Sequence, residues 1–252
     1  MERLWGLKGR VHAHAWDIIS NHKPSIFIIL ETKNGDERAK IVGKFMGFDE
    51  VLMVQPEGRR GGIWAFYNPN MASLIVHNEK TPHYSHALLK INPNLSEVLI
   101  TGVYAPSTSA KRHELWPEIK SSLPPSDTPW LVLGDLNVVT TQIKKLGGGR
   151  FNSNQWEDMK MLGDTATLVD MGFQGNPYTW SNSREGFGLI RERLDHALAN
   201  PTWMNTFPNT QIDKEQATTT SSNPIPARVW SLLKRIFTSS THMVHGFLLI
   251  ML

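Results

Sequence analysis

The stretch Trp130-Leu-Val-Leu-Gly-Asp-Leu-Asn137 decides the fold class, because a continuous apolar run leads directly into polar residues at a turn. A short apolar run without alternation is typical of a strand that is buried on both faces of a sheet. Gly134 lets the chain turn sharply, and the turn then presents the carboxylate of Asp135 and the amide of Asn137. The pattern predicts a buried strand that ends at a polar site, although Asp-x-Asn is also common in ordinary turns.

A second run of the same character, Pro24-Ser-Ile-Phe-Ile-Ile-Leu30, ends at Glu31. Shorter β-rich runs predict strands over residues 61–67, 73–76, 84–91, 97–104, 178–180 and 193–198. Tight Asn-Pro turns between the first of these suggest an antiparallel meander. Helices are predicted over residues 11–21, 110–123, 153–162 with an extension allowed to 170, and 201–207. Strands with helices at intervals predict an α/β layered sandwich.

The composition is that of a globular protein, and it limits the chemistry. The chain has 252 residues, of which 40% are hydrophobic and 19% charged, so one core can hold it. It has no cysteine, which excludes thiol catalysis and Cys-based zinc sites and leaves oxygen or imidazole ligands for any metal. The net charge of +3 does not by itself argue for a nucleic-acid partner.

The two ends of the sequence carry no targeting or membrane signal. Residues 1–10 lack the apolar stretch of a signal peptide, and the apolar run at residues 243–252 is too short for a span, which needs roughly 20 residues. We therefore expect a soluble, intracellular monomer without a membrane partner, and the sequence indicates no protein partner. The pattern changes after about Gln211, which predicts a domain over residues 1–211 and a divergent tail over 212–252 that is loose or only partly helical.

Polar residues end the predicted buried strands or lie within them: Glu31, Asp135, Asn137 and Asp195. Taken singly, each carboxylate can be a helix cap, an ion-pair partner or a turn residue. Taken together, carboxylates at strand ends can converge on one cleft. Oxygen ligands of this kind are those that Mg²⁺ prefers, with Mn²⁺ as an alternative. The sequence thus predicts that Glu31, Asp135 and Asn137 meet in one metal-dependent site.

Several motifs occur in the order seen in one family. They are Leu30-Glu-Thr-Lys33, Gly61-Gly-Ile-Trp64, Gly102-Val-Tyr-Ala-Pro106, Pro129-Trp-Leu-Val-Leu-Gly-Asp-Leu-Asn137, Tyr178-Thr-Trp180 and Glu192-Arg-Leu-Asp-His-Ala-Leu-Ala-Asn200. The ordered set resembles the endonuclease/exonuclease/phosphatase superfamily. Within it, the set is most similar to the apurinic-type endonuclease domain of plant non-LTR (LINE-type) retrotransposons. The resemblance covers about residues 10–211.

The resemblance implies a four-layer α/β sandwich, in which helices flank two mixed, largely antiparallel sheets. It also implies Mg²⁺-dependent cleavage of DNA phosphodiesters, which would place an active protein in the nucleus. Glu31 matches the family's metal ligand and Tyr104 the tyrosine near the scissile phosphate. Asp135 matches the aspartate that orients or activates the attacking water, and Asn137 the asparagine beside it. Asp195 matches the aspartate that pairs with the catalytic histidine. Without the family, Tyr104 can be a strand aromatic and Asp195 a cross-strand partner.

Two departures from the family pattern bear on activity. The family opens with a strand ending in Asn-x-Arg-Gly, and residues 1–10 lack this string, so we expect an incomplete first strand. The family also has Ser-Asp-His, whose histidine is essential to hydrolysis, and no such string follows Asp195. Neither His242 nor His245 follows an aspartate, and His196 should face away from Asp195 because successive strand residues alternate. We expect impaired cleavage, since loss of a positioned acid or base costs about 10²–10⁴ in rate.

The sequence also contains a basic loop, and it leaves two other functions open. Lys144, Lys145 and Arg150 flank the glycines at 147–149 and predict contacts with DNA phosphates, with an ordinary solvated loop as the alternative. A phosphatase of the same superfamily is one other function, because Mg²⁺-assisted attack on phosphorus serves both reactions. A non-catalytic nucleic-acid-binding remnant is the other, and the missing histidine favours it.

Overall fold

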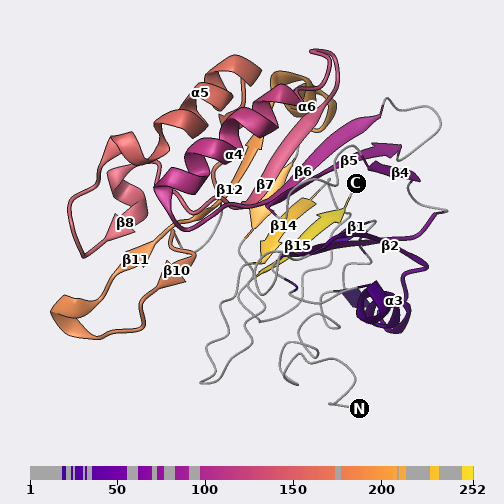
Figure 1. The fold of residues 1–252 in the computed structure, drawn as a ribbon, viewed down its shortest axis with the longest axis horizontal. Coiled ribbons are helices and arrows are strands. Elements are labelled where there is room, and N and C mark those ends of the chain that lie inside the picture. Colours follow the sequence, from indigo (N-terminus) through magenta and orange to yellow (C-terminus); the bar gives the residue numbers. More distant parts are fainter. Residues whose placement is uncertain are drawn as a thin grey trace.

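The structure is a computed structural model of the chain, shown in Figure 1. It describes residues 19–20, 24, 26–30, 32, 36–55, 62–69, 73–76, 83–90, 97–173, 177–208, 210–213, 228–232 and 246–251. Two six-stranded sheets and one three-stranded sheet organise these residues. Within this described part, no helix has the length and apolar character that crossing a membrane requires.

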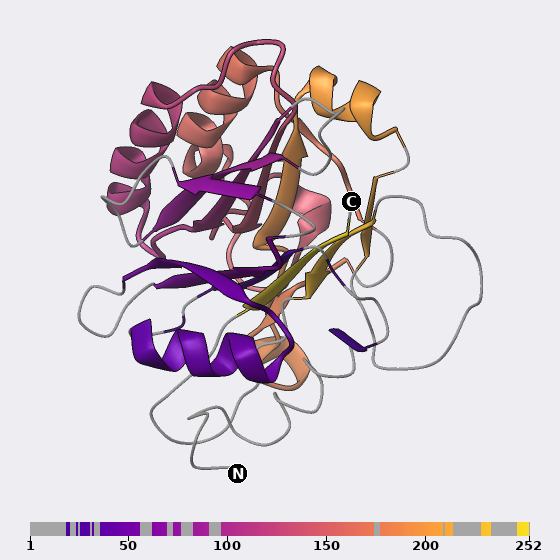
Figure 2. The same cartoon turned by 90° about the vertical axis from the view of Figure 1, so that its right-hand side faces the viewer.

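The first sheet is built around β1 (Ile26–Leu30), whose residues 26–29 are buried, as the continuous apolar run predicts. In sheet order its strands are β13 (Gln211–Asp213), β14 (Arg228–Leu232), β15 (Gly246–Met251), β1, β3 (Ile63–Tyr67) and β2 (Glu50–Val54). Both neighbours of β1, which are β15 and β3, run antiparallel to it. Helix α3 (Asp36–Phe45) covers the outer face of this sheet, as Figure 2 shows.

The second sheet contains the strand that decides the fold. In sheet order its strands are β4 (Ser73–Val76), β5 (Tyr84–Lys90), β6 (Val98–Tyr104), β7 (Trp130–Asp135), β12 (Asp195–Ala199) and β9 (Val169–Asp170). Strands β6 and β7 run parallel, and the other neighbouring pairs run antiparallel. Helices α4 (Ser109–Ser121) and α5 (Glu157–Ala166) cover the outer face, where Trp116 and Leu162 belong to one buried cluster with Val132.

The two six-stranded sheets pack face to face through a single apolar core. Ile26 and Ile28 of β1 belong to the same buried cluster as Leu131 and Leu133 of β7. The layers therefore follow in the order α3, first sheet, second sheet, and then α4 with α5 (Figure 2). This is the four-layer α/β sandwich with mixed, largely antiparallel sheets that the resemblance implies, and the buried Trp203 belongs to the core between the sheets.

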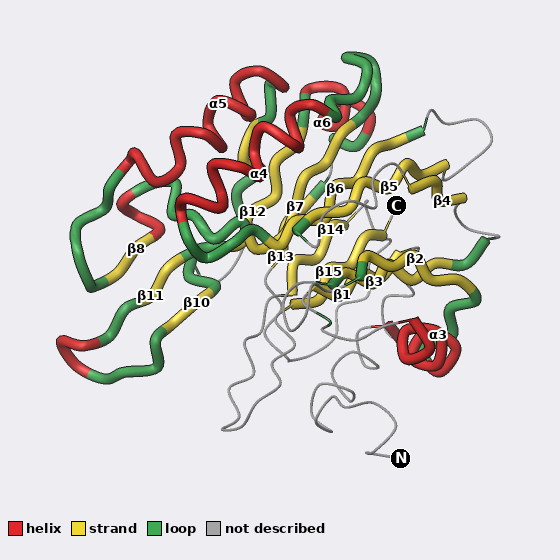
Figure 3. Tube along the Cα trace, in the orientation of Figure 1, coloured by secondary structure: helices red, strands yellow, loops and turns green. Residues whose placement is uncertain are grey.

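A small three-stranded sheet projects beyond one end of the second sheet (Figure 3). Its strands are β10 (Trp180–Ser181), β11 (Arg191–Glu192) and β8 (Lys145–Leu146), in that order, with antiparallel pairing. The remaining short elements are η1 (Gln142–Lys144), η2 (Ser153–Trp156), η3 (Gly186–Gly188) and α6 (Pro201–Thr206). This small sheet places Trp180 and Glu192 close to the ends of β7 and β12, where the predicted site residues lie.

Most predicted elements occur where the sequence places them, but the meander and the helix that begins at residue 153 differ in part from the expectation. Strand β3 belongs to the first sheet, so the antiparallel meander contains only β4, β5 and β6. Helix α5 ends at Ala166 because Thr167 adopts a left-handed conformation with φ of 53°, and residues 169–170 form β9 instead. The predicted helix over residues 11–21, apart from residues 19 and 20, lies outside the described part, as do residues 1–10.

The segment after Asp213 differs from the loose or partly helical tail that the sequence suggests. It contains β14 and β15, and residues 246–250 of β15 pair with all five residues of β1. The apolar run at residues 243–252 is too short for a membrane span, but a continuous apolar run of this length also suits a strand inside a sheet. Residues 214–227 and 233–245 lie outside the described part. The predicted domain boundary at residue 212 stays a prediction.

Candidate active site

Strand register brings three of the predicted residues into one row at the end of the second sheet. Tyr104, the last residue of β6, lies opposite Asp135, the last residue of β7, and Asp135 lies opposite Asp195, the first residue of β12. Residues that oppose each other share a face of the sheet, with Cβ atoms about 4.5–5.5 Å apart in antiparallel pairs. Leu131 and Leu133 precede Asp135 on that face and belong to the core between the sheets. The row therefore continues this layer to its edge.

The two carboxylates of the row are buried side by side. Asp135 and Asp195 are each 5% exposed. Like charges directly opposite each other on neighbouring strands destabilise a sheet, so this arrangement calls for positive charge nearby. Arg193, which is also buried, supplies part of it through its charge interactions with Asp170 and Asp195. Its guanidinium lies over the ring of Phe173, 3.7 Å from the ring centre. Burial lowers the pKa of Arg193, and the negative charges of nearby carboxylates, among them Asp195, oppose that shift.

Asn137 is held in place by the side chain of Asp135 and by the backbone of Ala105, which follows β6. Its φ of 51° lies in the left-handed region, which Asn tolerates better than most residues. Its Nδ2 donates a hydrogen bond to the carbonyl oxygen of Ala105 at 2.7 Å, and its backbone N–H donates to Oδ1 of Asp135 at 3.0 Å. The backbone N–H of Ala105 in turn donates to the carbonyl oxygen of Asp135 at 2.8 Å. The turns that follow β6 and β7 are thus joined at the site.

The predicted metal ligand lies just beyond the described part of β1. Leu30 is the last residue of that strand, and Glu31 follows it directly, but Glu31 is outside the described residues. Strand β1 contacts β6, the strand that carries Tyr104. The meeting of Glu31 with Asp135 and Asn137 in one cleft therefore stays a prediction.

The donor chemistry of the row fits a divalent cation. Asp135, Asp195 and Asn137 offer oxygen atoms, and Mg²⁺ usually takes one or two carboxylates together with water and substrate phosphate. A cation would also offset the repulsion between the two buried carboxylates. Among the described residues, no group of three or more acidic or histidine side chains is placed to hold a metal by itself.

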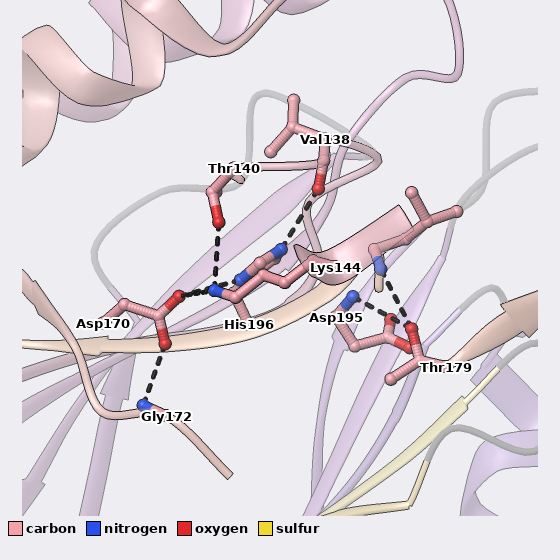
Figure 4. A network of polar contacts seen from close by, with 9 residues as sticks. Val138, Thr140, Lys144, Asp170, Gly172, Thr179, Asp195 and His196 are labelled. Carbon is pink, nitrogen blue, oxygen red and sulfur yellow. Dashed lines mark hydrogen bonds and ion pairs between the residues drawn. The ribbon is translucent and has the colours of Figure 1, made fainter. Parts of the chain in front are cut away.

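His196 faces away from Asp195, which confirms the alternation expected for β12. Figure 4 shows that the imidazole instead joins a separate network on the helix side of the sheet. Nδ1 of His196 lies 3.1 Å from Oδ2 of Asp170, and Nε2 lies 3.1 Å from the carbonyl oxygen of Val138. On the other side, the backbone N–H groups of Leu194 and Asp195 donate to Oγ1 of Thr179 at 2.9 and 3.3 Å. His196 therefore does not take the place of the missing histidine.

In the predicted basic loop, two of the three cationic side chains form ion pairs within the protein. Nζ of Lys144 donates to Oδ2 of Asp170 at 2.6 Å and to Thr140 at 2.9 Å, and Lys145 forms an ion pair with Glu192. The two lysine side chains are only 13% and 14% exposed. Binding of DNA phosphates by these lysines stays a prediction, and both ion pairs would have to open for it. Arg150, by contrast, is exposed.

Asp170 is the centre of that internal network. Burial raises the pKa of this carboxyl, but the hydrogen bonds and charges of His196 and Lys144 outweigh burial and hold the pKa well below its usual value. Its second oxygen accepts a hydrogen bond from the backbone N–H of Gly172 at 2.9 Å. The ionised Asp170 thus fixes the loop that runs from Asn137 toward β8.

A cavity of about 420 Å³ opens beside the row. Its lining includes Ser107, Ser109, Arg112, Asn137, Trp180 and Leu194. The lining combines hydroxyl, amide and guanidinium groups and the carboxylate of Glu192 with an indole ring and an aliphatic side chain. A phosphate-bearing ligand with a flat or apolar portion suits such a surface.

Sequence reasoning missed two residues next to the row. Arg112 lies on α4 at the spacing of the buried residues Leu115, Trp116 and Ile119, and a charged residue at core-facing positions of a helix is a signal that could have singled it out. His83 precedes β5, and its Nδ1 lies 3.2 Å from the carbonyl oxygen of Tyr104. No local motif marks His83, because only the pairing of β5 with β6 brings it there.

Comparison with solved structures finds the same fold in proteins of low sequence identity. An AP endonuclease from Leishmania major has a TM-score of 0.65 at 13% identity, covering 96% of this chain and 82% of that one. The endonuclease domain of TRAS1, a telomere-specific non-LTR retrotransposon, has a TM-score of 0.58 at 12% identity, with 97% and 94% covered. A mannosyl-6-phosphatase from Bacteroides thetaiotaomicron has a TM-score of 0.53 at 13% identity, with 96% and 90% covered. At such identities these likenesses show the fold alone.

Sequence comparison gives the family. No curated protein matches the chain. The sequence pattern of the endonuclease/exonuclease/phosphatase family, however, matches residues 8–231, which include every residue of the row and the cavity. The chain therefore belongs to the endonuclease/exonuclease/phosphatase family.

Proposed function

We propose that the chain is a Mg²⁺-dependent endonuclease-like domain that cleaves phosphodiesters, derives from a LINE-type retroelement of plants and has impaired activity. The observation that carries the proposal is the row of Tyr104, Asp135 and Asp195 across three neighbouring strands, with Asn137 fixed beside it. A phosphate placed at this edge can meet a phenol, an amide and two carboxylates at once. The ordered motifs of the sequence support the retroelement origin.

Each residue of the site has a role that follows from its chemistry. Asp135 is an acceptor that can orient the attacking water, and its Oδ1 is already fixed by the backbone N–H of Asn137. The second hydrogen of the Asn137 amide can donate to a phosphate oxygen, as can the phenol of Tyr104. Glu31 would hold the divalent cation, which when bound stabilises negative charge on the phosphate. The family is generally dependent on divalent metals, which supports this assignment.

The proposed impairment follows from the lack of a histidine that would transfer a proton at this site. The family's histidine would act beside Asp195, and the sequence after Asp195 contains no Ser-Asp-His. His196 is engaged with Asp170 and Val138 on the other side of the sheet. Without a positioned acid or base the rate should fall by about 10²–10⁴ relative to an intact relative. Binding of DNA through phosphate contacts does not depend on that histidine, so affinity and turnover should separate.

The substrate is proposed to be DNA, in the nucleus, with the chain acting as a monomer. The named AP endonuclease and retrotransposon endonuclease that share the fold support a nucleic-acid substrate over a small phosphate ester. The exposed Arg150 is available for phosphate contacts. Because a mannosyl-6-phosphatase has the same fold, hydrolysis of a phosphomonoester is the competing reaction that the experiment must include.

The test compares three measurements on the whole chain. Supercoiled plasmid is incubated with Mg²⁺ or with EDTA, a phosphomonoester is offered under the same conditions, and DNA binding is measured across a range of salt. We expect slow nicking that EDTA abolishes, no turnover of the monoester, and binding that weakens with salt. Nicking that persists in EDTA, or turnover of the monoester above nicking, would contradict the proposal.

A non-catalytic nucleic-acid-binding remnant is the second candidate, and the missing histidine favours it. In that case the plasmid would be bound with the same salt dependence but would stay supercoiled in Mg²⁺ and in Mn²⁺ over many hours. The two candidates therefore differ in one observable, the Mg²⁺-dependent appearance of the nicked form.

A further inference from the structure

We propose that Arg112 is a positioning residue of the site, whose buried guanidinium holds the loop after β6 and, through that loop, orients Asn137 beside Asp135. The inference rests on the proposed function, because the residues it orients are those assigned to cleavage. Arg112 lies on α4, outside every motif that the sequence shares with the family.

The guanidinium binds the loop directly. Nη1 of Arg112 donates hydrogen bonds to the carbonyl oxygens of Pro106, at 2.9 Å, and of Ser107, at 2.8 Å. The side chain is buried, with 6% of the residue exposed. A charged group out of water costs several kcal/mol unless it is paired or hydrogen-bonded, so these contacts are not incidental to the fold.

The same loop holds Asn137. Ala105 immediately precedes the two residues that Arg112 binds, and its carbonyl oxygen accepts the hydrogen bond from Nδ2 of Asn137. Carbonyls of three consecutive residues, 105 to 107, thus accept from Asn137 and Arg112. A displacement of this loop must move the Asn137 amide. The hydrogen bond from Nδ2 to Ala105 therefore makes the orientation of the Asn137 side chain depend on the position of this loop.

Charge links Arg112 to the row as well. Burial lowers the pKa of Arg112, and the negative charge of Asp135 opposes that shift, so the two groups interact electrostatically. The positive charge of Arg112 therefore offsets the charge of Asp135, as the charge of Arg193 offsets those of Asp170 and Asp195. An uncharged residue at position 112 would leave the carboxylate pair with less compensation.

Stability alone does not explain an arginine here. The neighbours of Arg112 on the buried face of α4 are apolar, and a Met would pack with them. The arginine also leaves its Nε buried without a hydrogen-bond partner among the described residues, which is unfavourable for folding. Unsatisfied buried groups of this kind call for an explanation, and the arginine's position at the wall of the cavity with Asn137 gives one.

The experiment uses three variants of the full chain. Arg112→Met removes the charge and the planar donors, Arg112→Lys keeps the charge but loses the fixed geometry, and Lys120→Met removes an exposed cation from the same helix as a matched control. Nuclear magnetic resonance of ¹⁵N-labelled protein reports the Asn137 side-chain amide through its chemical shift and its hydrogen exchange. Nicking kinetics report kcat and KM separately.

Arg112→Met should shift the Asn137 amide resonances, speed their exchange, and lower kcat by about 10–10²-fold with KM little changed. Arg112→Lys should lie between the wild type and Arg112→Met, and Lys120→Met should match the wild type. An Asn137 amide that is unchanged in both Arg112 variants would overturn the inference, as would equal changes in Lys120→Met. If Arg112→Met does not fold, Arg112→Lys decides alone. If the wild type does not nick DNA, the amide measurement still decides, which separates this inference from the proposed function.

Discussion

Replacement of Gly134 by Ala should be among the most damaging single changes in this protein. Gly134 lies in β7 directly before Asp135, with φ of +140°, a backbone conformation that residues with a Cβ rarely adopt. A Cβ built there lies 2.0 Å from the carbonyl oxygen of Val103 and 2.9 Å from its carbonyl carbon. These are backbone atoms of the paired strand β6, so no side-chain rotation relieves the clash.

The cost has two parts that can be added. The unfavourable backbone conformation costs about 1–3 kcal/mol, and forcing extra atoms into a well-packed core costs about 1–3 kcal/mol. The sum, about 2–6 kcal/mol, is a large share of the roughly 5–15 kcal/mol by which folded domains are stable. Relief requires β6 and β7 to separate next to the Tyr104–Asp135 pair, so the site should be disturbed even in molecules that stay folded.

The assay is urea unfolding followed by tryptophan fluorescence, for which the chain offers nine Trp residues. The matched control is Gly47→Ala, because Gly47 has φ of +84° but no atom within 4 Å of an added Cβ. In this control only the cost of the backbone conformation applies. Gly134→Ala should therefore lower the free energy of unfolding by at least about 1–3 kcal/mol more than Gly47→Ala does. Equal losses in the two variants would refute the reasoning, since the contact with Val103 would then carry no energy.

Two further predictions concern charges. Asp170→Asn should lower the free energy of unfolding at pH 7, because it leaves the Lys144 ammonium and the His196 imidazole without their carboxylate partner. Since the folded pKa of Asp170 is depressed, its contribution is complete above the unfolded pKa of about 3.9 and is lost as pH falls from there toward the folded pKa. The gap between wild type and variant in urea titrations should therefore narrow below about pH 4, and a gap that widens on acidification would count against the network. Arg150→Ala should lower the slope of log affinity for DNA against log salt concentration by about one counterion. The same substitution at Lys144 should leave this slope unchanged, because Lys144 is paired with Asp170; an equal decrease would show that the pair opens when DNA binds.

The strands could be predicted from the sequence where the apolar pattern was strong. The run before Asp135 and the run before Glu31 became β7 and β1, because an uninterrupted apolar strand has few alternatives to a buried place in a sheet. Helix α3 was missed because its ten residues mix charges with Gly43 and bury only a few positions. The partners of each strand could not be read either, since an apolar run does not say which sheet it joins; β3 and β15 are the two cases.

The residues that form the row could be singled out from the sequence, but their arrangement in the sheet could not. Motif order singled out Tyr104, Asp135 and Asp195, whereas their alignment in one row depends on pairing between strands that are distant in sequence. The same limit explains Lys144 and Lys145. Their spacing beside glycines suits a phosphate-binding loop, and nothing local shows that the fold brings a carboxylate to each. Whether a charged side chain is buried and paired depends on tertiary contacts, which a local sequence pattern does not contain.

If the row forms a Mg²⁺-dependent site for phosphodiester cleavage, the rate of nicking must depend on Asp135. The initial rate of plasmid nicking in Mg²⁺ is compared between the wild type, Asp135→Ala and, as a control, Asp164→Ala, which removes an exposed carboxylate of α5. We expect slow nicking by the wild type, the same rate for Asp164→Ala, and a rate about 10²–10⁴-fold lower for Asp135→Ala. Nicking by Asp135→Ala at the wild-type rate would contradict the account, because cleavage would then take place without the residue at the centre of the row.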